Sequence, residues 1–524
     1  MARRAQPLGL RLAAGGAALA VALLVFGPLV AVALRAEGAS RLASADWAAV
    51  RFTLVQAVLS ALLSVGLAIP VARALSRRRF PGRRFLVTAL GAPFLLPVIV
   101  AVLALLTVFG WNGALNAGLA AMGLPKFDIY GLQGVLLAHV FFNLPLATRM
   151  ILSGWSRVPA ESFRLAASLD LDDRAVFRVI ELPMLRQSLP GAFVLVFLLC
   201  LTSFAVVLTL GGGPRATTIE LAIYHAFRFE FDLGRSALLA TVQIVLGLGA
   251  AVLALAVVQP EPGAGLDTPV RRWDGGGWRR GTDGLALVLT AVFVGLPLAS
   301  VFLRGVGALP DLPVSVLWAT LRSILVALAA TGLTLALALP LALAIGGSGG
   351  GSRGGRAARL AEVLGSLSIA ASPLVLGTGL FLILNPVVDP VALALPVAAL
   401  VNALMALPFA LRALVPPARE THLRFDRLSE SLDLSAWSRI RLVTLPRLRQ
   451  PLGFALGLAA ALSAGDLGVV TLFTDPAQAT LPLEMYRLMD AYRTDQAAAA
   501  ALMLTTLAFA LFGIFDRIGR DAEA

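Results

Sequence analysis

Long runs of apolar residues, separated by short polar segments, dominate the pattern along the chain. A helix that crosses a membrane needs about 20 consecutive apolar residues to span the hydrocarbon core. Runs of this length without charge predict twelve spans, so we expect an all-α integral membrane protein. The predicted spans are residues 12–34, 52–72, 86–110, 131–148, 189–210, 236–258, 285–303, 323–346, 363–385, 390–411, 451–474 and 496–515.

The polar segments between these runs predict how the spans are oriented. If the N-terminus is cytoplasmic, most of the 43 Lys and Arg residues fall in segments on the cytoplasmic side. The positive-inside rule then predicts a multi-pass protein of the cell inner membrane with both termini in the cytoplasm. Because the net charge of +13 is spread over many segments, it predicts no nucleic-acid-binding face.

The composition excludes several classes of function. The chain is 58% hydrophobic and 14% charged, whereas soluble domains are about 45–50% apolar and about 25% charged. A single cysteine, Cys200, excludes an internal disulfide, and three distant histidines predict no metal site. The only lysine, Lys126, is not part of a phosphate-binding loop. We therefore expect a chain that is not an enzyme, binds no cofactor and hydrolyses no ATP by itself.

An internal repeat divides the chain into two halves. Residues 164–187 and 427–450 align without gaps, and half of the aligned positions are identical. The same offset pairs Leu144-Pro145 with Leu407-Pro408. The repeat predicts a tandem duplication in which each copy contributes six spans. A polar stretch rich in Gly, Pro and Arg, residues 259–283, is predicted to be the cytoplasmic linker between the copies.

The repeated segments predict paired cytoplasmic loops that contain short helices. In the first copy, Pro159 is expected to open a helix through Leu169, Asp170-Leu171 to form a bend, and Asp172 or Asp173 to cap a second helix that stops before Leu182-Pro183. In the second copy, the equivalent expectations are a helix after Pro416 or Pro417, a bend at Asp433-Leu434 and a cap at Ser435.

Amphipathic helices in such loops have two plausible uses. They can rest in the lipid headgroup layer, or they can dock in a groove on a partner protein. The chain carries two equivalent loops at equivalent depth and has no energy source of its own. These two properties favour docking onto a symmetric cytoplasmic motor.

The paired loops resemble the signature loop of ABC-importer permeases, which reads Glu-Ala-Ala, three residues, Gly, nine residues, Ile-x-Leu-Pro. The tail of this pattern falls on Ile180, Leu182 and Pro183 and on Val443, Leu445 and Pro446. Its head is degenerate and falls on Arg164-Leu165-Ala166 and on Arg427-Leu428-Ser429. Asp170 and Asp433 occupy the glycine positions, where aspartate is among the few residues that tolerate a left-handed bend. Both heads lack the glutamate of the pattern, so the resemblance does not carry over a role that depends on that carboxylate.

Nearly the whole chain resembles one subfamily, the fused two-lobe permeases of thiamine importers. The stretches that carry this resemblance are Gln56-Ala57, Leu59–Val65, Arg77–Arg83, Tyr130–Pro145, Ser203–Tyr224 and Gly465–Val470. The resemblance implies twelve helices arranged as two tandem six-helix type I ABC importer permease lobes. It also implies import of thiamine or its phosphate esters, two copies of an ATPase subunit that carry ATP and Mg, and a periplasmic thiamine-binding protein. Ferric-iron permeases share the fused plan and remain the alternative.

The resemblance also sets the expected domain boundaries. The expected parts are residues 1–50 as the first helix and an outer loop, 51–258 as the first ABC transmembrane type-1 domain, 259–283 as the linker, 284–316 as the seventh helix and an outer loop, 317–516 as the second type-1 domain, and 517–524 as a cytoplasmic tail.

A few polar residues within or beside the spans are candidates for contact with cargo. Asp466 lies well inside a predicted span, where a carboxylate is costly and usually faces a cavity or a partner. A carboxylate on the path suits thiamine, whose thiazolium ring is permanently cationic. Asp466 equally suits the cap of a broken helix beside Gly465 or a position near the outer surface. Ser203 is a second candidate on the path. His139 is expected to be a hydrogen-bonded core residue.

The outer loop after residue 210 has a flexible and a functional interpretation. It carries a glycine run followed by polar residues, and it is either a flexible loop or a contact for the binding protein. The resemblance favours contact, with Gly212, Pro214, Arg215 and Glu220 as candidates. The rival function from another class is a twelve-span secondary transporter. Such carriers keep several charges inside the bundle, whereas only one is predicted here, so an ABC permease is favoured.

Overall fold

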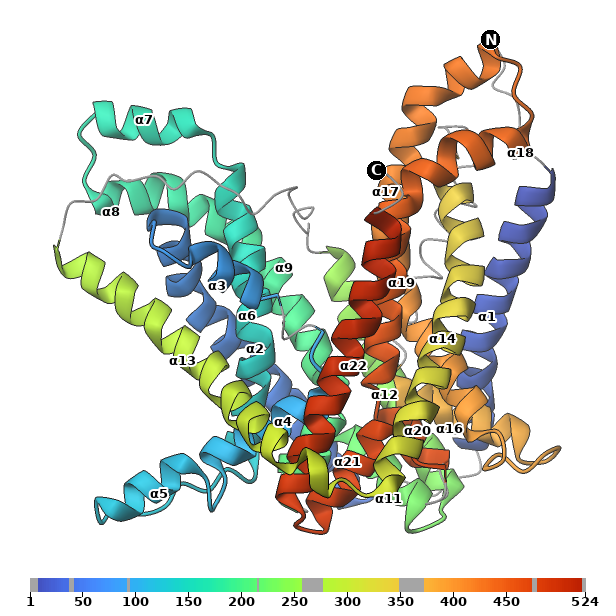
Figure 1. Ribbon diagram of the computed structural model, residues 1–524, viewed down its shortest axis with the longest axis horizontal. Helices are drawn as coiled ribbons and strands as arrows, with labels where there is room; N and C mark the ends of the chain where they lie inside the picture. The colour runs from blue at the N-terminus through green and yellow to red at the C-terminus, as the bar shows by residue number, and fades with distance from the viewer. Residues whose placement is uncertain are drawn as a thin grey trace. The chain divides into compact units, whose positions relative to one another are not determined.

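Helices account for all regular secondary structure in the part of the chain that the structure describes. The computed structural model describes residues 8–36, 42–91, 95–213, 216–256, 277–347, 372–473 and 478–520. The described residues form two compact units (Figure 1). We call residues 43–222 and 246–306 the first-repeat unit, and residues 1–42, 223–245 and 307–524 the second-repeat unit.

The first-repeat unit contains the helices between the two ends of the first sequence repeat. They are α2 (Ser44–Arg77), α3 (Arg83–Ala89), α4 (Val98–Phe109), α5 (Ala114–Ala121), α6 (Leu132–Arg157), α7 (Ala160–Ser168), α8 (Asp173–Val176), the π-helix η2 (Phe177–Glu181), α9 (Leu182–Leu201), α10 (Ala205–Leu210) and most of α13 (Gly277–Ala308). Its core lies where α2, α6 and α9 pack together.

The second-repeat unit repeats this plan. It contains α1 (Leu8–Ala36), the 3-10 helix η4 (Leu309–Asp311), α14 (Val314–Gly346), α16 (Pro373–Leu384), α17 (Ala394–Ser431), α18 (Ala436–Arg439), the π-helix η5 (Ile440–Thr444), α19 (Leu445–Ala464), α20 (Gly468–Phe473), α21 (Leu481–Asp490) and α22 (Thr494–Arg520). Two further helices, α11 (Ile219–Arg228) and α12 (Leu233–Ala256), each contribute residues to both units.

The first helix of each sequence repeat packs within the unit formed by the other repeat. Helix α1 lies against α14 and α16, and a Cβ atom at Gly379 would come within 2.4 Å of the Pro28 carbonyl oxygen. Helix α13 lies in the first-repeat unit, where Ser300 bonds Thr107 at 2.9 Å between the hydroxyl oxygens. Each repeat therefore completes its helix packing with a helix supplied by the other copy.

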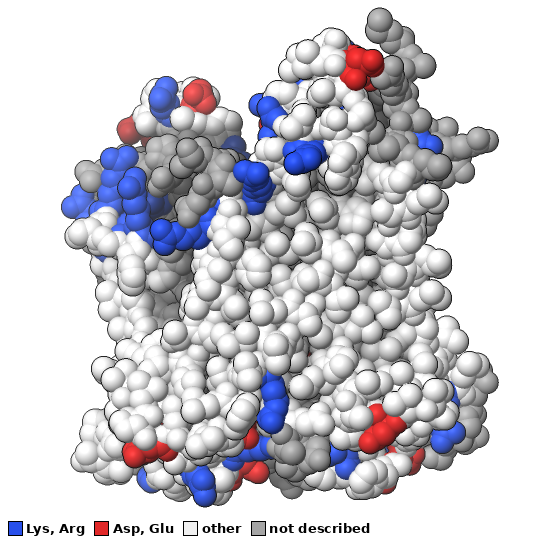
Figure 2. Space-filling model, turned by 45° about the vertical axis from the view of Figure 1, so that its right-hand side comes forward, with Lys and Arg blue, Asp and Glu red and all other residues white. Residues whose placement is uncertain are grey.

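The spans agree with most of the hydropathy pattern. Within the described residues, 11 helices are long and apolar enough to cross a membrane, and α16 is a shorter apolar helix within the predicted span 363–385. The part of that span before residue 372 lies outside the described residues. On the face shown in Figure 2, a broad middle band is mostly uncharged, and the charged side chains gather toward the top and bottom of the view. This distribution suits helices that cross a bilayer.

Several predicted boundaries differ from the structure, and the predicted span 451–474 is interrupted between α19 and α20. The predicted span 86–110 is two helices, α3 and α4, and α4 begins directly after Pro97, which has no N–H to continue an earlier helix. The predicted span 189–210 is interrupted between α9 and α10 at residues 202–204. Helix α13 begins at Gly277, inside the predicted linker, and residues 257–276 of that linker lie outside the described residues.

Candidate functional site

The first paired loop, residues 158–183, folds as the local sequence predicts up to its last turn. Pro159 precedes α7, and Asp170 makes the bend with a left-handed φ of 48°. The Asp172 carboxylate accepts a hydrogen bond from the Ala175 amide at 2.8 Å and caps α8. Phe163, Ala166 and Val176 form a small buried cluster that holds the two helices together. The expected helix, bend and cap are confirmed.

The Leu182-Pro183 pair lies inside a continuous helical path, and this corrects the expectation that the second loop helix stops before it. Residues Phe177–Glu181 form a π-helix that leads directly into α9. The Leu182 amide donates to the Phe177 carbonyl, five residues earlier. A proline lacks the amide donor and its ring clashes with the carbonyl four residues before it. The wider π turn removes that conflict, so the helix passes through the proline.

The second paired loop, residues 421–446, repeats the bend and the π turn. Asp433 has a left-handed φ of 45°, and the Ser438 amide donates to the Ser435 hydroxyl at 3.1 Å. The π-helix η5 precedes Leu445-Pro446, and the Leu445 amide donates to the Ile440 carbonyl. The predicted bend and cap are confirmed in this copy as well.

The start of the second loop differs from the expectation. Helix α17 does not begin after the proline pair but continues through Pro416 and Pro417 to Ser431. Proline fixes φ near the helical value and each ring removes one amide donor. Leu414 and Ala418 are buried on either side of the pair, and a Cβ atom at Gly346 would come within 2.9 Å of the Ala418 Cβ atom. Packing of α14 against this segment stabilises the helix across both prolines.

The residues aligned with the degenerate signature head divide into a buried and an exposed set in both loops. Ala166 and Ser429 are buried. Leu165 and Leu428 are 61% and 54% exposed, and Arg164 and Arg427 are exposed beside them. An exposed leucine at the same place on each loop helix costs free energy in water and suits contact with a partner protein. Pro183 is exposed, and Leu445 is 36% exposed.

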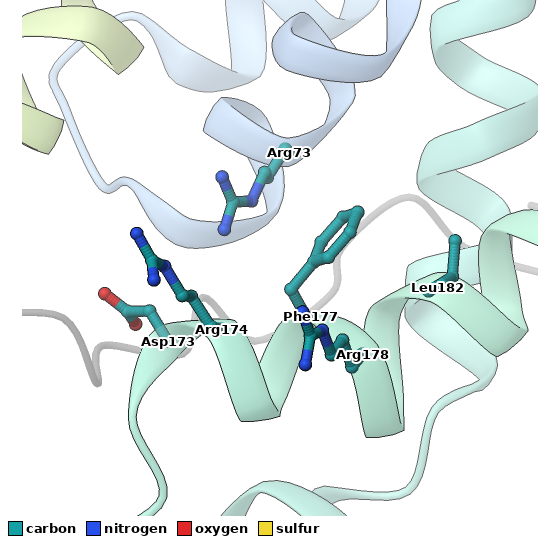
Figure 3. A pocket seen from close by; sticks show the side chains of 6 residues that line it. All are labelled: Arg73, Asp173, Arg174, Phe177, Arg178 and Leu182. Atoms are coloured by element: carbon teal, nitrogen blue, oxygen red, sulfur yellow. The ribbon is translucent and has the colours of Figure 1, made fainter.

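A basic pocket of about 530 Å³ lies beside the first paired loop (Figure 3). Its lining residues are Arg73, Asp173, Arg174, Phe177, Arg178 and Leu182. The Arg73 guanidinium carbon lies 5.9 Å from the centroid of the Phe177 ring, a cation–π distance. Arg73 comes from α2, so this pocket joins the loop to a spanning helix.

A buried acidic residue next to this pocket was missed by sequence reasoning. Glu181 ends the π-helix and is fully buried, and its Oε1 atom lies 2.6 Å from Nη2 of Arg77. Its Oε2 atom accepts a hydrogen bond from Nε of Arg73 at 3.2 Å. These arginines served only to predict the orientation, and Glu181 lies 104 residues from Arg77 and 108 residues from Arg73 along the chain. A glutamate just before a predicted spanning segment could have indicated this ion cluster, because a carboxylate buried there needs a positively charged partner.

Polar side chains also meet at the interruption between α9 and α10. Nε2 of His139 bonds the Ser203 hydroxyl at 2.8 Å, and Nδ1 of His139 bonds the Ser60 hydroxyl at 2.8 Å. His139 is buried, which confirms the expected hydrogen-bonded core histidine. Gln56 donates to the Cys200 carbonyl at 2.8 Å, at the end of α9. Ser203 is thus bonded within its unit and partly exposed, and its place on a cargo path stays a prediction.

Asp466 lies at the equivalent interruption of the second repeat, between α19 and α20. Its Oδ1 atom accepts a hydrogen bond from the Gly468 amide at 3.2 Å, as the helix-capping alternative requires. Its Oδ2 atom is buried and has no hydrogen-bond partner within the described residues. Nearby, the Asn402 amide donates to the Ser463 hydroxyl at 3.0 Å. One carboxylate oxygen therefore caps a helix, and the other is buried without a hydrogen-bond partner among the described residues.

The candidate contacts for a binding protein are only partly supported. Gly212 is exposed, with a φ of 71°, and a Cβ atom there would lie 2.9 Å from the Tyr130 Cβ atom. This close approach explains why the position is a glycine, without invoking contact with a partner protein. Pro214 and Arg215 lie outside the described residues. Glu220 is fully buried in α11, so its side chain offers no surface for such a contact, and that part of the expectation is corrected.

Two short helices outside the spans, α11 and α21, bring aromatic side chains together in the second-repeat unit. Burial raises the pKa of Tyr224, and burial together with Asp490 and Tyr224 raises the pKa of Tyr486 to about 12. Burial lowers the pKa of His225, so this imidazole is neutral at neutral pH. The phenol hydroxyls therefore stay protonated and can donate hydrogen bonds at physiological pH.

Comparison with known proteins gives relatives over nearly the full length of the chain, although no family model matches. The thiamine transport system permease protein ThiP of Brucella abortus is 40% identical over 96% of this chain and 94% of its own length. The protein of the same name from Escherichia coli is 41% identical over 91% of this chain and 90% of its own length. The sulfate transport system permease protein CysW of Synechocystis is 26% identical over 38% of this chain and 72% of its own length.

These relatives carry the names of transport permeases and not of enzymes. Together with the 11 candidate spans, they identify an integral inner-membrane protein. An identity of 40% over 96% of the chain exceeds what a shared helical architecture alone produces. The chain therefore belongs to the family of thiamine transport system permease proteins.

Proposed function

We propose that this chain is the permease subunit of an ATP-driven ABC importer that moves thiamine, or its phosphate esters, from the periplasm to the cytoplasm. The observation that carries the proposal is the 40% identity to thiamine transport permeases over 96% of the chain. In both repeats a helix is interrupted, between α9 and α10 and between α19 and α20, and polar side chains form hydrogen bonds at the break. These breaks support a transport path, because discontinuous helices often supply binding groups inside a membrane.

The paired loops support docking of two copies of an ATPase subunit, one on each loop. Each loop presents an exposed leucine next to a left-handed bend, Leu165 on the short helix α7 and Leu428 near the end of α17. The ATPase subunits supply ATP and Mg, and this chain supplies the docking surfaces and the path. The distribution of Lys and Arg supports placing these loops and both termini in the cytoplasm.

The carboxylate of Asp466 supports a cationic cargo. Its Oδ2 atom is buried without a partner in the described part of the second-repeat unit, and a buried charge is costly unless it is paired. A permanently cationic thiazolium ring would pair with it during passage. Ser203, at the equivalent break of the first repeat, supplies a hydroxyl for the polar part of the cargo. On the opposite side, the loop that contains Gly212, Pro214 and Arg215 receives the periplasmic binding protein.

Uptake into vesicles that contain this chain, its ATPase and its binding protein tests the proposal. We expect labelled thiamine to accumulate only when ATP and all three components are present, and ferric iron not to accumulate. Accumulation of ferric iron without thiamine would support the iron-importer alternative. Uptake driven by a proton or sodium gradient in vesicles without the ATPase would contradict the ABC assignment.

A further inference from the structure

The two paired loops are joined to different spanning helices. They are equivalent in sequence and share the bend and the π turn, so equivalent attachments would be expected. The side chains around the two π turns differ, however, at three pairs of repeat-equivalent positions. Arg73, Arg77 and Glu181 of the first repeat correspond to Ala336, Pro340 and Thr444 of the second.

In the first repeat, an ion cluster ties the π turn to the end of α2. Glu181 is fully buried, and it bonds Arg77 at 2.6 Å and Arg73 at 3.2 Å. The Arg77 side chain is only 4% exposed, so water screens this pair little. Breaking such a buried pair leaves an uncompensated charge, which makes the attachment strong and directional.

Deeper in the unit, the same helix is hydrogen-bonded to α11, α9 and α6 near the interruption between α9 and α10. Three side chains on one face of α2 make these bonds: the Thr53 hydroxyl accepts from the Ile219 amide at 2.9 Å, Gln56 donates to the Cys200 carbonyl, and Ser60 bonds His139. From Thr53 to Arg77, a helix extends roughly 36 Å at 1.5 Å per residue. Helix α2 is thus bonded to the loop at one end and to the α9–α10 break region toward the other.

In the second repeat, the loop is instead continuous with α17 and braced against it. Helix α17 runs through Pro416 and Pro417 into the loop. Asp426, on this helix, accepts from Nδ1 of His422 at 3.1 Å and from Nη1 of Arg439 at 3.3 Å. The Thr444 hydroxyl donates a hydrogen bond to the Arg439 carbonyl of its own loop at 3.5 Å. Asp426 therefore ties the last turns of α17 to Arg439 within the loop, and α14 carries Ala336 and Pro340 at the positions equivalent to Arg73 and Arg77.

We propose that Glu181 is a positioning residue that fastens the first paired loop to α2, so that ATPase movement enters the first repeat through α2 and the second repeat through α17. This inference rests on the proposed function of the loops as ATPase docking sites. It makes the two docking positions mechanically unequal, although the repeats share the loop fold.

Hydrogen exchange in the complete complex tests the inference without depending on the cargo. In the wild-type complex, ATP binding is expected to change amide exchange at residues 70–77 of α2 and at residues 410–430 of α17. Glu181→Gln should abolish the change in α2 and preserve it in α17, whereas the matched control Thr444→Val should preserve both. An ATP response of α2 that survives in Glu181→Gln would overturn the inference.

A double variant separates positioning from simple stability. Glu181→Leu with Arg77→Met replaces the buried ions by apolar side chains, a change that is often neutral for folding. We expect this variant to assemble like the wild type but to hydrolyse roughly threefold or more ATP for each thiamine imported, a modest change in coupling. A wild-type ratio in the double variant would show that the ions serve folding alone. Absence of thiamine uptake by the wild-type complex would contradict the proposed cargo, while the exchange result would still decide the inference.

Discussion

At the residue scale, the two repeats place different chemistry at the same helix break. The first repeat has a neutral chain of Ser60, His139 and Ser203, in which both ring nitrogens of the histidine are bonded. The second repeat has Asn402 at the histidine position and Asp466 at the Ser203 position. The duplicated scaffold thus carries one neutral and one acidic group, and only the acidic one suits a cation.

Asp466→Asn is expected to lower thiamine uptake and thiamine-stimulated ATP hydrolysis about tenfold, which corresponds to about 1.4 kcal/mol of lost interaction. The asparagine oxygen can still accept the hydrogen bond from the Gly468 amide, so the helix cap and the fold should survive. Asp389→Asn is the matched control, because Asp389 accepts from the Val391 amide in the same way but in an exposed loop. Unchanged uptake in Asp466→Asn would show that the carboxylate is only a cap.

The two aspartates at the loop bends make a second prediction at this scale. A left-handed φ costs most residues roughly 1–2 kcal/mol, whereas glycine adopts it freely. Asp170→Ala should therefore increase hydrogen exchange in residues 160–176, and Asp170→Gly should leave it close to the wild-type level. Equal exchange in the two variants would show that the bend is determined by its surroundings. Asp433→Ala and Asp433→Gly repeat the same comparison in the second loop.

At the element scale, local signals predicted the helices, the bends and the caps, while packing decided where helices continue. Asp170 and Asp172 specify a bend and a cap within a few residues, so the sequence alone sufficed. Prolines did not predict helix ends reliably, because packing against neighbouring helices decides whether a helix continues through a proline. Helix α4 begins after Pro97, yet α17 continues through Pro416 and Pro417. The Glu181–Arg77 pair joins residues 104 positions apart and could not be read from local pattern.

The exposed leucines of the loop helices predict how the ATPase is held. Leu165→Glu and Leu428→Glu should each weaken binding of the ATPase about tenfold or more, because burial of a leucine contributes about 1.5–3 kcal/mol. Co-purification of the ATPase and its titration onto the permease in vesicles would measure this loss. Leu124→Glu serves as the control, since Leu124 is also 50% exposed but lies outside both loops. Equal ATPase binding by all three variants would show that the loops are not part of the docking surface.

The π turns predict a different defect from the docking helices. Charged or bulky replacements at Leu182 or Leu445 should leave expression and ATPase binding normal, because both leucines lie where the loop enters its spanning helix. They should uncouple ATP hydrolysis from uptake, since the turn no longer passes movement into α9 or α19. Paired measurements of phosphate release and thiamine uptake separate this outcome from loss of docking. Normal uptake in both variants would contradict the role of the turns.

At the scale of the whole molecule, the two copies exchange their first helices. Helix α1 packs with α14 and α16 of the second repeat, and α13 joins the first-repeat unit through contacts such as Phe293 with Phe141. The hydropathy pattern predicts these helices but does not indicate which unit they join, because any apolar face can pack in lipid or on another helix. The exchange makes each unit depend on the other copy for a complete helix set.

The contact between α1 and α16 offers a direct test of this exchange. A Cβ atom at Gly379 would lie 2.4 Å from the Pro28 carbonyl oxygen, so Gly379→Ala should force the helices apart at a cost of about 1–3 kcal/mol. Gly66→Ala is the matched control, because Gly66 also lies within a helix but has no neighbouring atom within 4 Å of the added carbon. We expect Gly379→Ala to lower the midpoint of thermal unfolding in detergent, and Gly66→Ala to leave it unchanged or raise it through better helix propensity. Equal midpoints for Gly379→Ala and the wild type would mean that α1 contributes little to the second-repeat unit, and the dependence of each unit on the other copy's helix would not hold.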